Sequence, residues 1–238
     1  MKNGLKILFF LSFNLVFHSL KAEWQLALIN DTDGFTYVRS GKGTTFTTVA
    51  TIQKDDLFYC ESSASDWWKV TTRKNVEGFV HKSRIQIVKD MPIGTKKKLI
   101  LTVFKTQELL GDQYTAGRIG GIQMMEHNDD KFVPMLEIFT TYFSKTGDTI
   151  LLRQFFDSIW AYSGSADERP SYTVGEIFIC KTELVTAVIK KLPTSQREHI
   201  VSAVDWGLLN HFNLSQEEPP RDKRYLEYKK KLNQIAIN

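Results

Sequence analysis

Short stretches of alternating apolar and polar residues fill the chain from residue 23 to residue 89, and turn-forming residues separate them. Trp24–Leu28 alternates, and Asn30–Gly34 has the composition of a turn. Gln53–Asp56 has the polar composition of a tight connection, and Thr72–Glu77 predicts a hairpin. About five short strands at this spacing favour a small β-barrel.

Residues 99–216 instead carry apolar residues at helical spacing. Pro134 is expected to open a helix whose core face carries Leu136, Phe139 and Phe143. Asp148 can cap the next helix, because a carboxylate at that position accepts hydrogen bonds from free N–H groups. Leu99–Leu110 fits a helix or a strand, and Gly111–Gly121 has the glycine content of a loop.

Two capping-box patterns mark further helix starts. Thr173 precedes Glu176 by three residues, and Ser195 precedes Glu198 by the same spacing, after Pro193 ends the previous helix. Four amphipathic helices with short connections predict an all-α bundle, with a HEAT-like stack as the alternative. The sequence shows no clean repeat, which favours the bundle.

Two segments flank this helical domain. Residues 90–98 are expected to form a linker, because Met91–Gly94 does not fit a regular element and Lys96–Lys98 is typical of a solvated charge run. Pro219 and Pro220 separate a C-terminal segment, 217–238, which predicts a charged and peripheral helix.

The N-terminus has the layout of a secretory signal peptide, residues 1–22. Lys2 and Lys6 give a basic start, Leu5–Phe17 is mostly apolar, and cleavage is expected after Ala22. The apolar run is shorter than the roughly 20 residues that cross a bilayer. The chain is therefore expected to be exported, periplasmic or secreted, with no membrane span after cleavage.

Export changes the interpretation of charge and cysteines. The formal charge is +4, and removing Lys2, Lys6 and Lys21 leaves about +1, so the composition does not favour a nucleic-acid partner. Cys60 and Cys180 are the only cysteines. Two buried free thiols are the preferred interpretation, and a disulfide in an oxidising compartment is the alternative.

Three segments carry a family resemblance: YVRSG at Tyr37–Gly41, WWKV at Trp67–Val70 and EGFVHKSRI at Glu77–Ile85. In this order and spacing, residues 31–88 resemble the bacterial SH3 family, SH3b type 3. The resemblance implies an SH3-like β-barrel that acts as a binding module. The chain departs from the family at Lys42–Gly43, where Pro-Ser is usual, and at Phe79, where Trp is common.

The resemblance also implies where a ligand lies, against the first long loop and the hairpin tips. The matching positions are Tyr37, Arg39, Ser40, Thr44 and Thr45, with Trp67 nearby. We expect Gly41 and Gly78 to serve turn geometry rather than ligands.

No catalytic residue, metal site or cofactor is predicted. His81 falls where the family has a strand residue, and Cys180 lies within an apolar helix rather than at the helix start that a cysteine nucleophile prefers. Glu126–Asp130 lacks the spacing of a zincin or a calcium loop, so it is interpreted as a polar loop that caps the Pro134 helix.

The loop from Ser163 to Tyr172 combines charged and aromatic residues, as protein-recognition patches do. Asp167, Glu168, Arg169 and Tyr172 are therefore candidates for binding a partner. The alternative is an ordinary helix connection with packed aromatic residues.

These features predict an exported, non-catalytic binding or adaptor protein. Its SH3-like module would recognise a cell-wall peptide (peptidoglycan) or a protein ligand, and its helices would hold a protein partner. An immunity or inhibitor protein is the first alternative. A cell-wall-degrading enzyme is the second, and it would need carboxylates facing one cleft. The candidates for those carboxylates are Glu126, Asp129, Glu168 and Glu176.

Overall fold

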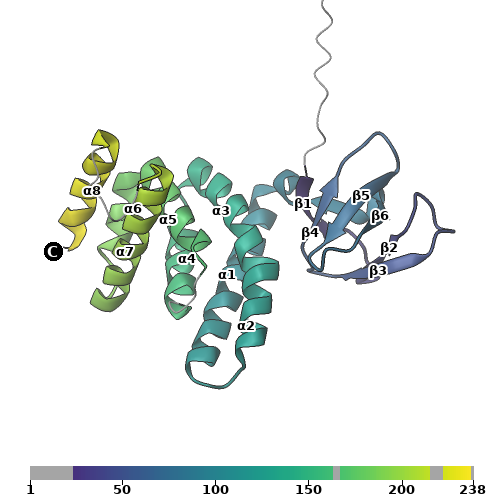
Figure 1. Cartoon of the computed structure of the whole chain (residues 1–238), viewed down its shortest axis with the longest axis horizontal. Coiled ribbons are helices and arrows are strands. Elements are labelled where there is room, and N and C mark those ends of the chain that lie inside the picture. Colours follow the sequence, from purple (N-terminus) through teal and green to yellow (C-terminus); the bar gives the residue numbers. More distant parts are fainter. Residues whose placement is uncertain (1–23, 163–166, 215–221, 237–238) are drawn as a thin grey trace, which may run out of the picture.

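The computed structural model describes residues 24–162, 167–214 and 222–236. A curled sheet forms the N-terminal part and helices form the rest, as Figure 1 shows. This β-then-α layout agrees with the predicted order of the two parts. The predicted signal peptide lies outside the described residues.

Seven strands of the described chain form one antiparallel sheet in the order β3-β2-β6-β5-β4-β1-β7. They are β1 (Trp24–Ile29), β2 (Phe35–Arg39), β3 (Thr48–Gln53), β4 (Phe58–Glu61), β5 (Trp67–Thr72), β6 (Glu77–His81) and β7 (Ile85–Ile87). The predicted turns lie between them: Asp55 and Asn75 take left-handed backbone conformations in the β3–β4 and β5–β6 connections. The sheet curls into a half-barrel around a small apolar core.

Strand β1 divides its side chains between two cores. Ala27 points into the half-barrel with Val38 and Val70. Leu26 and Leu28 belong to the large hydrophobic cluster of the helices. Because side chains alternate along a strand, one face of β1 closes the half-barrel and the other holds the helical part against it.

The described helical part contains eight α-helices. They are α1 (Ile93–Thr115), α2 (Gly121–His127), α3 (Val133–Thr146), α4 (Thr149–Ala161), α5 (Arg169–Cys180), α6 (Thr182–Ile189), α7 (Thr194–His211) and α8 (Lys223–Ala236). Short 3-10 turns, η1 (Lys82–Arg84) and η2 (Val88–Asp90), precede them, and a π-helical turn, η3 (Asn128–Phe132), joins α2 to α3.

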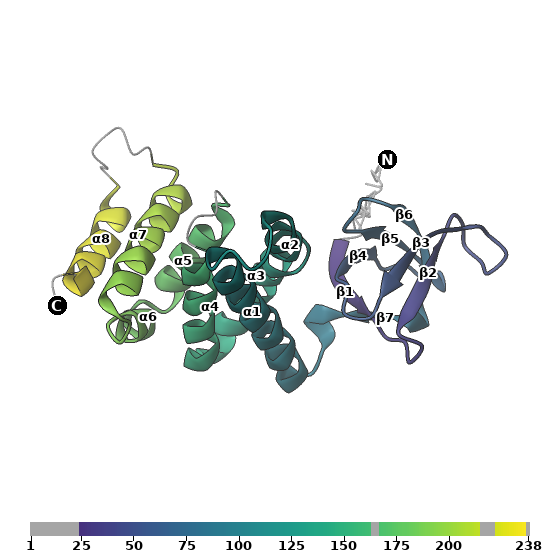
Figure 2. The same cartoon turned by 90° about the horizontal axis from the view of Figure 1, so that it is seen from below.

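The helices follow one another in an extended row that begins beside the sheet (Figures 1 and 2). Helix α1 packs on α4, α3 packs on α5, α5 packs on α7, and α7 packs on α8. This row differs from the compact four-helix bundle that the sequence favoured. The described residues hold more helices than expected, because Lys181 divides one predicted helix into α5 and α6 and because α1 and α2 form where no definite helix was predicted.

Helix α1 begins inside the predicted linker and runs into the predicted loop. It starts at Ile93, directly after Pro92, whose fixed φ and missing N–H suit a helix entrance. It includes Gly111, which lies against the backbone of Ala161 in α4 so closely that a Cβ there would overlap it. Gly111 therefore serves helix packing, and only the residues from Ala116 to Gly120 connect two helices.

Pro134 lies in the first turn of α3, as predicted, but that helix does not begin from a loop. Helix α2, the π turn η3 and α3 form one continuous helical run from Gly121 to Thr146. Proline cannot donate a backbone hydrogen bond, and a helix interior tolerates it only where the bonding pattern changes locally. The wide turn at Asn128–Phe132 lies directly before Pro134 and provides that change. Glu126–Asp130 is consequently helical rather than a loop.

The predicted cap at Asp148 is confirmed. Its carboxylate accepts hydrogen bonds from the N–H groups of Ile150 and Leu151, at 3.1 and 3.2 Å. Lys97 on α1 lies 2.7 Å from the same carboxylate. Burial opposes ionisation of Asp148, but the hydrogen bonds from Lys97 and from the two N–H groups hold its pKa below the usual value.

We therefore expect Asp148→Ala to lower the free energy of unfolding by about 1 kcal/mol at neutral pH, as loss of a helix cap does. Asp148→Asn, which keeps the cap acceptor but removes the charge, should cost less. A depressed carboxyl pKa adds stability that is complete above the unfolded value of about 3.9 and is lost as the pH falls through the folded pKa. Urea denaturation at pH 7 and pH 2.5 measures this, and equal costs for Asp148→Ala at both pH values would contradict it.

Neither predicted capping box exists. Helix α5 starts at Arg169, so Thr173 lies buried within it, and Pro170 occupies its first turn. Lys181, whose backbone is not helical (φ −142°, ψ 56°), separates α5 from α6. Helix α7 begins at Thr194 after Pro193, without a side-chain cap.

Helix α8 is charged, as predicted, but it is not peripheral. Tyr225, Leu232 and Ile235 are buried in the large hydrophobic cluster. The Tyr225 hydroxyl and Lys229 also contact the carboxylate of Asp205 on α7. The apolar residues of this segment therefore complete the end of the helical row.

The two cysteines differ in environment. Both are free, and Cys60 is buried in the half-barrel core, where burial raises its thiol pKa to about 11. Cys180 is exposed at the end of α5. The expectation of two buried thiols is therefore correct for Cys60 and wrong for Cys180.

The apolar face of β1 is not the only link between the half-barrel and the helices. Charged side chains also join them. Arg73, in the β5–β6 turn, donates to the carbonyl oxygen of Asp129 and lies 3.7 Å from the carboxylate of Asp130. Lys131 donates to the carbonyl oxygen of Asp55 at 3.0 Å. The turns of the half-barrel thus rest on the π turn of the helical part.

Candidate functional site

A recess of about 400 Å³ opens on the half-barrel between the start of β2, the Ser40–Thr47 loop and the β6–β7 connection. We call it the half-barrel recess. It is lined by Asp31, Asp33, Phe35, Thr36, Tyr37, Arg39, Thr44, Trp67, His81, Ser83 and Arg84. Aromatic rings, hydroxyl groups and charges of both signs therefore meet in one depression.

Arg39 organises one wall of the recess. Its guanidinium donates to the carbonyl oxygen of Phe46 at 3.1 Å and to the Thr48 hydroxyl at 3.0 Å. The guanidinium carbon also lies 5.1 Å from the centre of the Tyr37 ring, within cation–π range. Arg39 therefore holds the long loop next to an aromatic ring whose outer side remains exposed.

Trp67 and His81 form another wall. Their ring centres are 5.5 Å apart in an edge-to-face arrangement. The Nδ1 atom of His81 lies 2.8 Å from the Ser83 hydroxyl, and the side chain caps the short η1 turn. These contacts fix both rings, which agrees with a structural role for His81.

The remaining charges belong to a carboxylate pair and one arginine. Arg84 contacts the carboxylate of Asp31, which is almost fully buried, and lies 3.5 Å from that of Asp33. Asp33 is exposed. An incoming ammonium or amide N–H group would thus meet the exposed carboxylate of Asp33, which Arg84 contacts through one oxygen atom.

Four residues that the resemblance implied line this recess: Tyr37, Arg39, Thr44 and Trp67. Ser40 and Thr45 are exposed on the same loop but are not among its lining residues. Asp31, Asp33, His81 and Arg84 were not among the implied ligand positions. The turn composition at Asn30–Gly34 was visible in the sequence, but its proximity to β6 depends on how the sheet curls.

Gly41 and Gly78 have a different role from the one expected. Neither adopts a positive φ. A Cβ at Gly78 would overlap Val38 and the backbone of Arg39, and one at Gly41 would overlap the Phe46 ring. Both glycines permit close packing rather than turn geometry.

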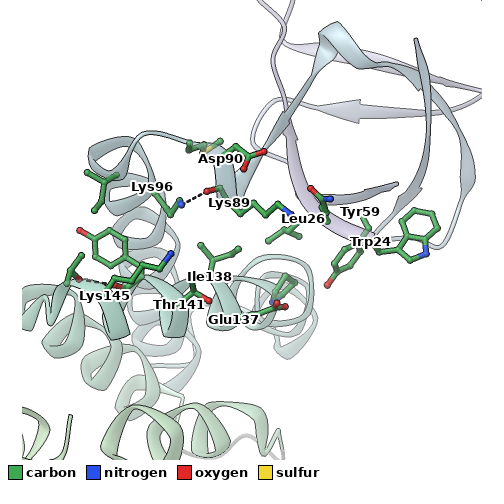
Figure 3. Close-up of a pocket in the computed structure, with 16 residues that line it drawn as sticks. Trp24, Leu26, Tyr59, Lys89, Asp90, Lys96, Glu137, Ile138, Thr141 and Lys145 are labelled. Carbon is green, nitrogen blue, oxygen red and sulfur yellow. Dashed lines mark hydrogen bonds between the residues drawn. The ribbon is translucent and has the colours of Figure 1, made fainter. Parts of the chain in front are cut away.

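A second cavity, of about 480 Å³, lies where the half-barrel meets the helices (Figure 3). We call it the junction cleft. Strands β1 and β4, the η2 turn, and helices α1 and α3 contribute to it. Its lining residues include Trp24, Leu26, Tyr59, Lys89, Lys96, Ile138 and Lys145. The sequence offered no signal for this cleft, because its walls come from distant segments.

Of the predicted partner-binding residues, some make hydrogen bonds within the protein and others are exposed. Asp167 accepts two hydrogen bonds of 2.9 Å from the Arg169 guanidinium and one of 3.1 Å from Asn128. The hydrogen bonds from Arg169 and Asn128 lower the pKa of Asp167, against the opposing effect of burial. Glu168 and Tyr172 are exposed, and Tyr172 borders a shallow groove between α3 and α5 together with Arg169.

A buried polar network explains the polar residues near η3. Gln107 accepts a hydrogen bond of 2.8 Å from the Nδ1 atom of His127 and donates to Asn128 at 3.2 Å. Burial, with a contribution from the charge of Lys131, lowers the pKa of His127 to about 4. The imidazole is therefore neutral at pH 7 and acts as a hydrogen-bond donor inside the fold.

The carboxylates that an enzyme would need do not converge. Glu126 borders a groove beside β3 and the β5–β6 turn, whereas Glu176 borders the groove between α3 and α5. Asp129 lies near Arg169, at 3.9 Å. Within the described residues, no group of three or more His, Cys, Asp or Glu side chains could hold a metal ion.

Comparison of the chain with protein-family models, curated proteins and solved structures found no match. Of the helices that the structure describes, none combines the length and apolar composition that a bilayer span requires.

Proposed function

We propose that this chain is an exported, non-catalytic binding protein whose half-barrel is an SH3-like module. Its half-barrel recess recognises a short peptide of the bacterial cell wall, or a protein segment of the same chemistry. The helical part holds a protein partner, with Glu168, Arg169 and Tyr172 on the contact surface.

One observation carries the proposal. Tyr37, Arg39, Thr44 and Trp67 are separated by up to thirty positions in the sequence, yet they line one recess. The family resemblance implies these four as ligand positions, and their convergence is what a ligand site requires. The N-terminal pattern of Lys2, Lys6 and Leu5–Phe17 supports export.

The chemistry of the recess suits a peptide. The exposed face of Tyr37 can pack against a small side chain or a bare backbone, and aromatic anchors of this kind dominate binding energy. Thr44 and Ser83 offer hydroxyl groups to backbone amides. Asp33 can accept from an amino group, and the Arg84 side chain is partly exposed beside it.

Retention on purified cell wall tests the proposal. The protein should sediment with insoluble peptidoglycan, and Tyr37→Ala should weaken the binding about tenfold, as loss of an aromatic hot spot of about 1.4 kcal/mol does. Tyr114→Ala is the matched control, since Tyr114 lies on α1 and both tyrosines are 45% exposed.

The control variant should bind as the unmodified protein does. Retention no greater than that of an unrelated protein of similar charge would contradict wall binding. An equal loss for Tyr37→Ala and Tyr114→Ala would show that the half-barrel recess is not the site.

A further inference from the structure

The junction cleft is a preformed cavity. Leu26 from β1 and Tyr142 from α3 are both buried in the large hydrophobic cluster, and Met91 and Ile138 pack against that cluster. All four residues line the cleft. Because one apolar core joins the two walls, the cavity exists without a ligand. Its volume of about 480 Å³ and its place between two parts of the chain are typical of small-molecule sites.

Lysines give the cleft a positive edge. Lys89, Lys96 and Lys145 line it, together with two acids, Asp90 and Glu137. The Lys96 ammonium donates to the carbonyl oxygen of Lys89 at 2.6 Å. Across the described residues, no carboxylate lies within ion-pair distance of any of these three ammonium groups, whereas the neighbouring Lys97 is paired with Asp148.

The charge is unevenly placed. Figure 3 shows Lys96 and Lys145 on the side of the cleft away from Trp24 and Tyr59, while Glu137 lies toward Tyr59. Leu26 and Ile138 lie between these two sides in the same view. Lys89 extends from the η2 turn toward Leu26 in that view, so the cleft has two lysines at one end, an apolar floor that Lys89 borders, and aromatic rings at the other end.

From this arrangement we propose that the junction cleft binds a small amphipathic anion, an apolar chain that bears one carboxylate. The carboxylate lies at Lys96 and Lys145, and the chain covers Leu26 and Ile138 and ends at Tyr59. A neutral head group would form no ion pair with Lys96 and Lys145, and a cationic head group would be repelled by them. A carboxylate pairs with them while the chain removes apolar surface from water.

Three decyl probes that differ only in the head group test this proposal. Decanoate, decanamide and decyltrimethylammonium are titrated into the protein by calorimetry, each below the concentration at which it aggregates. We expect saturable one-to-one binding of decanoate, at least about tenfold tighter than that of the other two. Equal affinity for all three, or no binding of decanoate at millimolar concentration, would overturn the proposal.

Variants locate the binding. Ile138→Trp fills the apolar middle and should abolish binding of decanoate, while Lys145→Glu reverses an exposed charge and should weaken it about tenfold. Lys190→Glu, an equivalent change at an exposed lysine at the end of α6, should leave the affinity unchanged. Circular dichroism melting verifies that each variant is folded.

The proposals for the half-barrel recess and for the junction cleft can be contradicted independently. Tyr37→Ala should not change binding of decanoate, and Ile138→Trp should not change retention on peptidoglycan. Decanoate binding that survives Ile138→Trp in a folded protein would place the ligand elsewhere and would overturn the proposal.

Discussion

Phe155→Ala is expected to lower the free energy of unfolding by about 4 kcal/mol, the largest stability loss predicted for a single substitution in this chain. Phe155 on α4 is fully buried. Its ring centre lies 4.8 Å from that of Phe139, 5.3 Å from Phe104, 6.2 Å from Phe156 and 6.3 Å from Phe132. Truncation removes one ring from the middle of this group and leaves a cavity that the surrounding rings cannot fill.

Urea denaturation followed by circular dichroism measures this loss. Ile150→Ala is the control on the same helix, because Ile150 is 64% exposed, and it should change stability by no more than about 0.5 kcal/mol. If the two variants had the same midpoint, Phe155 would not be at the centre of the helical core.

Gly207→Ala is expected to cost about 3 kcal/mol, at the upper end of the range for an overpacked core. Helices α5 and α7 approach each other closely where Gly175 faces Gly207. A Cβ at Gly207 would lie inside van der Waals contact with the carbonyl oxygen of Ser171 and 2.8 Å from the amide nitrogen of Gly175. These are backbone atoms, so the helices must separate to make room.

Gly94→Ala provides the matched control. Gly94 lies in the first turn of α1, and a Cβ there would meet nothing within 4 Å. Because alanine favours helix more than glycine does, this variant should be neutral or more stable by up to about 1 kcal/mol. The account of the α5–α7 crossing would be wrong if both substitutions raised the melting temperature.

Local signals in the sequence were reliable where one residue decides the structure. Asp148 caps α4 because one of its carboxylate oxygens reaches N–H groups two and three residues away, while the distant contact with Lys97 uses the other oxygen. The turns at Asp55 and Asn75 formed as expected for the same reason. Such features depend only on neighbouring residues.

Signals that compete with tertiary packing were misleading. Thr173 and Glu176 have capping-box spacing, yet Thr173 is buried within α5 because packing against α7 extends that helix back to Arg169. Pro134 is a common helix opener, but the π turn before it lets one helical run continue through it. Helix α8 has six charged residues among its fourteen, and its three buried residues decide where it packs.

The site residues were predictable only in part. Resemblance to the SH3b family implied Tyr37, Arg39, Thr44 and Trp67, and these line the half-barrel recess. Asp33 and Arg84 join them through the curl of the sheet, which no local pattern encodes. The junction cleft depends on the outer face of β1, and alternation alone does not show which face meets the helices.

The most direct test of the central claim, a peptide site in the half-barrel recess, is nuclear magnetic resonance of the amide-labelled protein with a soluble peptidoglycan fragment. The account predicts saturable shift changes that centre on the amides of Tyr37, Arg39, Thr44 and Trp67, with the α1–α8 amides unaffected. Shift changes confined to the helical amides, or no changes at saturating fragment, would contradict it.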